Sequence, residues 1–248
     1  MRKHPVPGDR RLPHGLKILY EDPDLFVVDK PSGLLSVRVA MNRSLTAHEI
    51  LEDYVRKGQA RSRKRLFVVH RLDKLTSGVL IFAKTEQAKD RLQADWNEST
   101  AKTYLAIVHG HLPEPSGTVS SYLAENAQLI VYSTRDPAKG KLSHTAWRVL
   151  REDKATSLLE ISLLTGRKNQ IRVHMTDLGH PVVGDPKYGG RGKDRNRLAL
   201  HAWKIAFRHP RDGRPMQCTS PPPPLFGRLG NLGNPERPCN PNHPPNPD

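Results

Sequence analysis

The sequence lacks the features that mark several large classes of protein. Its 248 residues include two cysteines, Cys218 and Cys239, too far apart for a CxxC motif, so we expect neither a disulfide framework nor a zinc site. No apolar run approaches the roughly 18 residues that cross a bilayer, and the N-terminus has no apolar signal segment. A GxxxxGKS-type phosphate loop, an HExxH pair and a glycine two residues before Ser77 are also missing. We therefore expect a cytoplasmic protein with reduced thiols, and we disfavour P-loop enzymes, zinc proteases and serine hydrolases.

Acidic residues are few relative to basic ones. Forty Lys and Arg stand against 25 Asp and Glu, which gives a net charge of +15 and favours a polyanionic partner such as nucleic acid. Residues 56–65 contain six cations and no acid. Such a run is often only a solvated face, but this one leads directly into a predicted strand and a polar loop. We therefore expect Arg61, Arg63, Lys64 and Arg65 to bind phosphates, with an affinity that falls steeply as salt rises.

That polar loop, VHRLDKLTSG at residues 69–78, lies between two apolar runs that predict buried strands, residues 66–69 and 79–83. Loops held between buried strands commonly present reactive groups. Asp73 is the only acid in the loop, and the nearby cations Arg71 and Lys74 favour its ionised form. Asp73 is therefore a candidate nucleophile or base. A turn cap or an ion pair is the structural alternative.

Hydrophobic periodicity predicts many strands and few helices. Helices are predicted at residues 44–56, 86–96 and 170–178, and strands at 18–20, 25–28, 66–69, 79–83, 103–108, 119–123, 129–134, 145–150, 157–164, 198–207 and 216–219. Thr46 and Glu49 have the spacing of a capping box, and Gly179 fits a helix C-cap. The pattern indicates an α+β fold with helices packed on a large, mixed and mostly antiparallel β-sheet.

Composition divides the chain into three parts. Residues 1–15 are rich in proline and cations and are predicted to form a mobile arm. Residues 16–220 are predicted to form the folded core. Residues 221–248 contain ten prolines and few large apolar side chains, so we expect a disordered tail.

Five sequence blocks, in order, resemble those of one enzyme family. They are ILYEDPDLFVVDKPSGLLS at 18–36, HRLD with TSG and AK between 70 and 84, KTYLA at 102–106, LTGRKNQIRVH at 164–174 and RLALHA at 197–202. Together they are similar to the RluA-type pseudouridine synthases, which convert uridine in RNA into its carbon-linked isomer. Because the blocks begin near residue 16, we expect a short form without the small ribosomal-protein-like RNA-binding domain that many relatives carry.

The resemblance implies catalytic roles for Asp73, Tyr104 and Arg172. Asp73 would act on the ribose, either as a nucleophile at the anomeric carbon or as a base that yields a glycal. Arg172 would hold Asp73 ionised, and Tyr104 would stack on the extruded uracil near carbon five. The expected substrate contacts are His70, Arg71, Leu72, Thr76 and Leu200. A structural helix arginine, a strand tyrosine and a core leucine are the alternatives for Arg172, Tyr104 and Leu200.

The resemblance also implies the partner and one departure from the family pattern. We expect a monomer that acts on structured tRNA, rRNA or both, with no metal, no redox cofactor and no membrane. Where the family usually has histidine before the Gln-Ile-Arg run, this chain has Asn169, which keeps a hydrogen-bonding edge but cannot titrate. We interpret Asn169 as a change in local support or in RNA contact.

Two other functions compete with this reading. A non-catalytic RNA-binding or chaperone protein could be built on the same fold, although the three expected catalytic residues are all present. Another base-modifying enzyme, such as a methyltransferase, is disfavoured because the chain has no glycine-rich cofactor loop. The sequence leaves the target uridine open.

Overall fold

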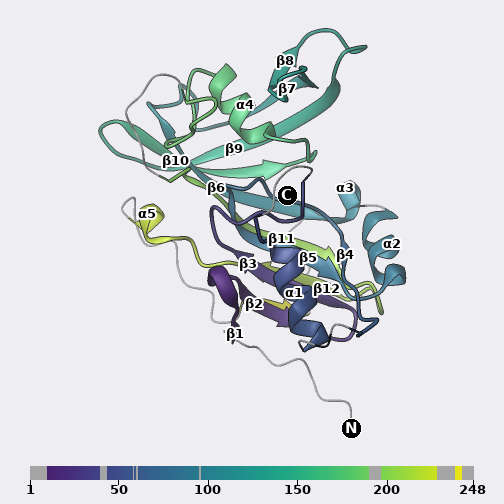
Figure 1. The fold of residues 1–248 in the computed structure, drawn as a ribbon. Helices are drawn as coiled ribbons and strands as arrows, with labels where there is room; N and C mark the ends of the chain where they lie inside the picture. The colour runs from purple at the N-terminus through teal and green to yellow at the C-terminus, as the bar shows by residue number, and fades with distance from the viewer. Residues whose placement is uncertain are drawn as a thin grey trace. The chain divides into compact units, whose positions relative to one another are not determined.

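The computed structural model describes residues 10–39, 44–57, 59, 61–94, 96–189, 197–227 and 238–241. The chain divides into two compact units. The first comprises Met1–Thr100, Ala202–Pro221 and Asn234–Asp248, and the second comprises Ala101–His201 and Pro222–Gly233. Each unit has its own sheet strands and helices (Figure 1).

The first unit contains the strands that flank the polar loop. Its elements are β1 (Arg10–Arg11), the 3-10 helix η1 (Pro13–Gly15), β2 (Lys17–Glu21), β3 (Leu25–Lys30), α1 (Ala47–Arg56), β4 (Phe67–Val68), β5 (Ser77–Ala83), α2 (Glu86–Ala94), α3 (Trp96–Ser99), the larger part of β11 (Leu200–Arg208), β12 (Pro215–Thr219) and β13 (Cys239–Pro241). The strand order is β1-β2-β3-β5-β11, with β12 and β13 beside β11 and β4 paired with the end of β5.

The β5 strand forms the centre of this unit because both of its faces are buried. Val79, Ile81 and Ala83 pack in one apolar cluster with the α2 residues Ala88 and Leu92. The alternate side chains of β5 face the other way, where the Phe82 ring lies 5.8 Å from the ring of His48 on α1. Burial on two faces explains why β5 reads as a continuous apolar run instead of an alternating one.

The α1 helix begins at Ala47, three residues after the predicted start, because Thr46 is its N-cap. The Thr46 side chain accepts a hydrogen bond from the Glu49 backbone N–H, and the Glu49 carboxylate accepts one from the Thr46 N–H, which completes the capping box. The predicted helix at residues 86–96 is divided into α2 and α3.

The second unit is a set of antiparallel strands with one main helix. Its elements are β6 (Ala101–His109), β7 (Ser116–Glu125), β8 (Val131–Thr134), β9 (Lys141–Glu152), β10 (Thr156–Leu163), α4 (Gln170–Asp177), the first two residues of β11 and α5 (Pro224–Gly227). The strand order is β6-β10-β9-β7-β8, and these pairs are antiparallel. The α4 helix ends at Leu178, and Gly179 adopts a left-handed conformation with φ of 84°.

The α+β class with a mostly antiparallel sheet is confirmed. Three expectations need correction. Residues 1–15 are not a mobile arm throughout, because β1 and η1 lie within them and β1 pairs with β2. The segment 221–248 is not without structure throughout, because α5 and β13 lie within it. The expectation of unpaired thiols was wrong: Cys218 on β12 and Cys239 on β13 are directly opposite in register and form a disulfide. No helix in the described part of the chain is long and apolar enough to cross a membrane.

Candidate active site

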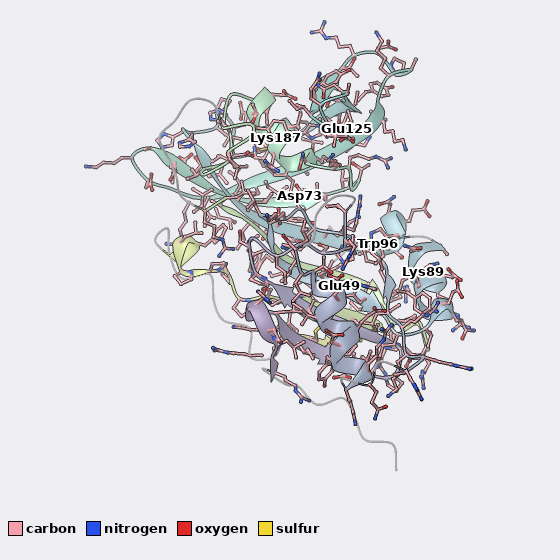
Figure 2. The ribbon with its side chains drawn as sticks, in the orientation of Figure 1. Glu49, Asp73, Lys89, Trp96, Glu125 and Lys187 are labelled. Atoms are coloured by element: carbon pink, nitrogen blue, oxygen red, sulfur yellow. A yellow bond between two sulfur atoms is a disulfide. The ribbon has the colours of Figure 1, made fainter. Side chains whose placement is uncertain are left out.

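Asp73 lies in the loop between β4 and β5, in the first unit (Figure 2). Its side chain is partly exposed, and its backbone carbonyl accepts a hydrogen bond from the Thr76 N–H at 3.1 Å, which closes a turn around it. The turn continues directly into buried β5. At the first residues of β5, Gly78 has a φ of 114°, and a Cβ atom there would lie 2.1 Å from the Ala202 carbonyl oxygen. Only glycine fits this position.

A buried lysine fixes the backbone of the Asp73 loop. The Lys30 side chain is 0% exposed, and its ammonium donates to the carbonyl oxygens of Pro31, Leu34 and Lys74 at 2.9, 2.7 and 3.2 Å. Three carbonyl partners compensate for removing the charge from water. Because Lys74 is adjacent to Asp73, Lys30 links the end of β3 to the candidate catalytic loop.

Two serines strengthen the same link. The Ser36 hydroxyl donates to the Leu72 carbonyl and accepts from the Leu72 N–H, at 2.8 and 3.0 Å. The Ser32 hydroxyl donates to the Leu75 carbonyl at 2.6 Å, and the Gly33 N–H donates to the Lys74 carbonyl at 2.8 Å. Residues 30–36 therefore hold the loop on both sides of Asp73, as a precise catalytic group requires.

The other expected contacts in this loop differ in exposure. Leu72 and Thr76 are buried, at 7% and 3%, whereas Arg71 is exposed. His70 is partly buried; its Nε2 accepts from the Ile81 N–H at 3.1 Å, and its ring lies 4.9 Å from the Trp96 ring. That bond requires the proton on Nδ1 in the neutral ring. Trp96 packs against the apolar core.

Tyr104 lies on β6 in the second unit, opposite Ile161 of β10. Its side chain is partly buried. Lys102 stands two residues earlier, so the two side chains lie on the same face of the strand. Lys102 is 7% exposed, and this burial lowers the pKa of its ammonium. Sequence reasoning missed Lys102, although the period of two along the strand already placed it beside Tyr104.

Arg172 projects from α4 into a buried polar cluster. Its Nε and one terminal nitrogen donate to the two carboxylate oxygens of Asp185, both at 2.7 Å, and the other terminal nitrogen donates to the Asn169 side-chain oxygen at 2.9 Å. The pKa of Asp185 is lowered: burial opposes this, but Arg172 and the backbone N–H groups of Tyr188 and Lys187 outweigh it. These bonds use three of the five guanidinium N–H donors.

Asn169, the departure from the family pattern, has a defined structural role in this unit. It adopts a left-handed conformation with φ of 54° immediately before α4, which asparagine tolerates well. Its side chain accepts from Arg172 and donates to the Tyr188 hydroxyl at 3.1 Å. Asn169 therefore supports Arg172, consistent with the expected local role.

The same motif is locked to its sheet by Gln170. The Gln170 oxygen accepts from the Thr165 hydroxyl and the Arg167 N–H, both at 2.9 Å. Its amide nitrogen donates to the His144 carbonyl and the Thr145 hydroxyl, also at 2.9 Å. The start of α4 is thus held in one position, and with it the origin of the Arg172 side chain.

The remaining expected residues lie apart from these clusters. Leu200, the first residue of β11, is 3% exposed in the second unit. Arg61, Arg63, Lys64 and Arg65 are exposed in the first unit, before β4. The sequence also contains a second basic segment at residues 187–197, of which 190–196 lie outside the described residues.

One group of side chains has the composition of a metal site. Ligand atoms of Asp22, Asp24 and His209 lie within 4.8 Å of one another. Asp22 already accepts from His209 Nε2 at 2.6 Å and from the backbone N–H groups of Asp24 and Leu25 at 2.8 and 2.9 Å, while Asp24 pairs with Arg211. These bonds make the group a structural clamp at the β2–β3 turn.

Comparison with known proteins identifies the family of this chain. A family model described as RNA pseudouridylate synthase matches residues 24–177, which include Asp73, Tyr104 and Arg172. The chain belongs to the RluA-type RNA pseudouridine synthases. These synthases are isomerases that act on RNA, so the expected enzyme class and RNA partner are confirmed, and the non-catalytic alternative is not favoured.

Individual relatives agree with this family. The synthase is 36% identical over 210 residues to the dual-specificity RNA pseudouridine synthase RluA of Yersinia pestis, covering 80% of this chain and 95% of that one. It is 38% identical over 220 residues to ribosomal large subunit pseudouridine synthase D of Nitrosomonas europaea, covering 84% of this chain and 62% of that one. Among solved structures, human RNA pseudouridylate synthase domain containing 1 matches with a TM-score of 0.70 and 28% identity over 86% of each chain.

Proposed function

We propose that this synthase isomerises uridine in structured tRNA, rRNA or both, and that Asp73 is its essential carboxylate. The observation that carries the proposal is the set of hydrogen bonds from residues 30–36 that hold the polar loop 69–78, whose only acid is Asp73. A reactive group needs such support, whereas a simple turn cap does not.

The reaction needs three roles, which we assign to Asp73, Tyr104 and Arg172. The target nucleotide is first extruded from its stack, at a cost of a few kcal/mol, which phosphate contacts offset. The bond between N1 of uracil and C1′ of ribose breaks, the base rotates, and a bond from C5 to C1′ replaces it. The proton leaves C5, and N1 gains one, so no atom is lost. The Asp73 carboxylate acts on the ribose, by attack at C1′ or by removing a ribose proton.

Arg172 is suited to orient a carboxylate because its guanidinium is held by Asp185 and Asn169. We assign to it the role that the family resemblance implies, which is to keep the catalytic carboxylate ionised and oriented. Tyr104 would stack on uracil, with Leu200 as apolar wall. Because Leu72 and Thr76 are buried, we assign them to shaping the loop. Arg71 and the 61–65 cations would bind phosphates, and His70 would hold the loop through β5.

We also propose that the synthase works as a monomer in the cytoplasm without a metal. Thiol–disulfide conditions there are reducing, so the Cys218–Cys239 bond would open in that compartment and β13 would be held by its strand pairing alone.

Mapping pseudouridines in RNA from cells with and without this protein tests the function. We expect one or a few uridines to lose modification when the protein is absent and to regain it when the parent gene is restored. Restoration with the Asp73→Asn variant should leave them unmodified. An unchanged map would contradict the proposed activity.

A further inference from the structure

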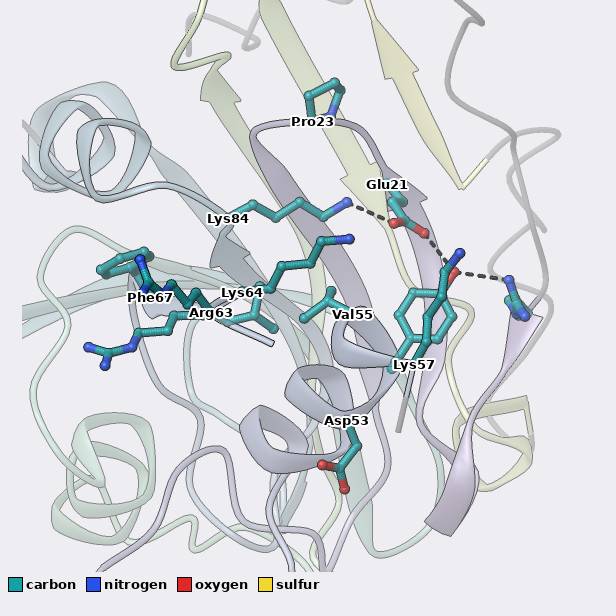
Figure 3. A pocket seen from close by; sticks show the side chains of 13 residues that line it. Glu21, Pro23, Asp53, Val55, Lys57, Arg63, Lys64, Phe67 and Lys84 are labelled. Carbon is teal, nitrogen blue, oxygen red and sulfur yellow. Dashed lines mark hydrogen bonds and ion pairs between the residues drawn. The ribbon is translucent and has the colours of Figure 1, made fainter. Parts of the chain in front are cut away.

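A cavity of about 1020 Å³ lies on the first unit, away from the Asp73 turn, between α1, the end of β2 and the residues that precede β4 (Figure 3). Six cations line it: Arg10, Lys57, Arg63, Lys64, Arg65 and Lys84. The acids in its lining are Glu21 and Asp53. A concave surface with one excess sign of charge concentrates ions of the other sign.

One carboxylate on the floor of the cavity is shared among several groups. Lys84 pairs with Glu21 at 2.7 Å, and Glu21 also accepts from the Tyr54 hydroxyl at 3.0 Å. Arg10 donates to that hydroxyl at 2.9 Å and lies 4.8 Å above the Tyr54 ring. Burial, together with Glu21, raises the pKa of Tyr54, which keeps the hydroxyl protonated. Glu21 therefore balances Lys84, whereas the charge of Arg10, held by a neutral hydroxyl, remains available to an anion.

The rim of the cavity has no such compensation. Within the described residues, the side chains of Lys57, Arg63, Lys64 and Arg65 have no carboxylate partner, and all four are exposed. Figure 3 shows Lys57 and Arg63 at opposite ends of the cavity, with the Asp53 carboxylate directed away from Lys64. Positive charge therefore follows the rim along its length, which suits a chain of phosphates better than one small anion.

The position of the cavity connects it with the reaction. Phe67 lines the cavity and is six residues before Asp73, so the two backbones lie within about 22 Å of each other. An RNA strand with its uridine at Asp73 can thus reach the cavity with nucleotides near the target.

We propose that this cavity is a second RNA subsite, which holds phosphates of the segment flanking the target uridine between Arg10 and Lys57 on one side and Arg63, Lys64 and Arg65 on the other. The inference rests on the proposed function for its substrate. It extends the expected phosphate contacts at residues 61–65 to Lys57 of the same basic run and to Arg10. Phosphate contacts of this kind provide affinity and register without reading bases.

The test is the salt dependence of RNA binding, measured by fluorescence anisotropy with bulk tRNA between low and moderate salt. The Arg10→Gln/Lys57→Gln double variant is compared with Arg151→Gln/Lys154→Gln, which removes the same charge from exposed positions on the other unit. Each single-strand phosphate contact contributes about 0.7 to the slope of log affinity against log salt. We expect the cavity variant to flatten the slope by about 1.4, and the control variant to keep the parent slope.

Two further arms make the result specific. The Arg10→Lys/Lys57→Arg variant should retain the parent slope, because the charges remain. Equal flattening by both glutamine variants, or by neither, would refute the subsite. If the cavity variant bound tRNA like the parent but lost binding to polyglutamate, the occupant would be an acidic protein segment, and the proposal would be wrong.

Binding and catalysis are scored separately. If the parent modifies RNA and the cavity variant keeps the parent slope, the subsite proposal is refuted and the proposed activity is not. If the parent modifies no RNA but the cavity variant flattens the slope as expected, the proposed activity is refuted and the subsite proposal is supported.

Discussion

Replacing Asp185 by asparagine tests whether Arg172 is held by a buried ion pair. The Asp185 side chain is 0% exposed and that of Arg172 is 7% exposed, and two parallel hydrogen bonds of 2.7 Å join them. Asp185→Asn keeps the shape of the side chain but removes its charge and one acceptor. The buried guanidinium then loses the opposite charge and keeps neutral partners in this cluster, among them Asn169, one amide oxygen and the Tyr188 ring at 5.0 Å.

The expected cost follows from that burial. Removing one partner of a buried pair typically destabilises a protein by about 3–5 kcal/mol, because the remaining charge is left uncompensated. An isosteric amide retains one hydrogen bond, so we expect a value near the lower end, about 3 kcal/mol. The matched control is Glu125→Gln, which breaks the exposed Glu125–Lys168 pair in the same unit. Exposed pairs contribute less than about 1 kcal/mol.

Urea unfolding of the two variants and the parent measures these costs, and RNA isomerisation of the folded variants measures the effect on Arg172. The pKa of Asp185 is lowered in the folded state, so its contribution is present above the unfolded pKa and is lost as pH falls through the folded one. The difference between parent and Asp185→Asn should therefore shrink in acid. Equal costs for Asp185→Asn and Glu125→Gln at neutral pH would refute the buried-pair account.

Three other changes test the supports of the site and the clamp at the β2–β3 turn. In the Asn169→His variant, an imidazole with a pKa near 6.5 cannot accept a hydrogen bond from Arg172 once it is protonated. The activity of this variant relative to the parent should therefore fall about tenfold between pH 7.5 and 5.5. A ratio of the two activities that stays constant across the pH–rate profile would contradict this. Lys30→Met leaves the Pro31 and Leu34 carbonyls without this donor, whereas the Lys74 carbonyl keeps the Gly33 N–H. We therefore expect a loss of about 2–4 kcal/mol in urea unfolding and slower isomerisation at saturating RNA, and parent-like values of both would separate Lys30 from the Asp73 loop. Burial alone would raise the pKa of Asp22, but hydrogen bonds from His209 and two backbone N–H groups lower it from 3.8 to about 2. The clamp therefore contributes about 2 kcal/mol of stability, which is lost as pH falls from about 4 to 2. Asp22→Asn should remove this part of the acid dependence, and an unchanged acid melting curve would count against the clamp.

Local patterns predicted the elements that carry the site. The capping box of Thr46 and Glu49 placed the start of α1, and the apolar run 79–83 identified β5. The signature loop identified Asp73 as a candidate because it was the only acid among cations. These features depend on neighbours in sequence, which is why one sequence was enough to predict them.

Long-range contacts could not be read in the same way. No local pattern singles out Lys30, yet it binds the Lys74 carbonyl 44 residues later. The partnership of Cys218 and Cys239 depends on the register of β12 and β13, which no spacing rule reveals. Asp185 lies 13 residues after Arg172, and their ion pair forms only because the fold brings that segment beside α4.

The most direct test of the account is the release of tritium from RNA labelled at carbon five of uridine, measured with parent and Asp73→Asn protein at saturating RNA, with RNA affinity determined on the same samples. We predict that the parent releases tritium and that Asp73→Asn releases none while its RNA affinity stays within about threefold of the parent. Release by Asp73→Asn at the parent rate would show that this carboxylate does not perform the reaction.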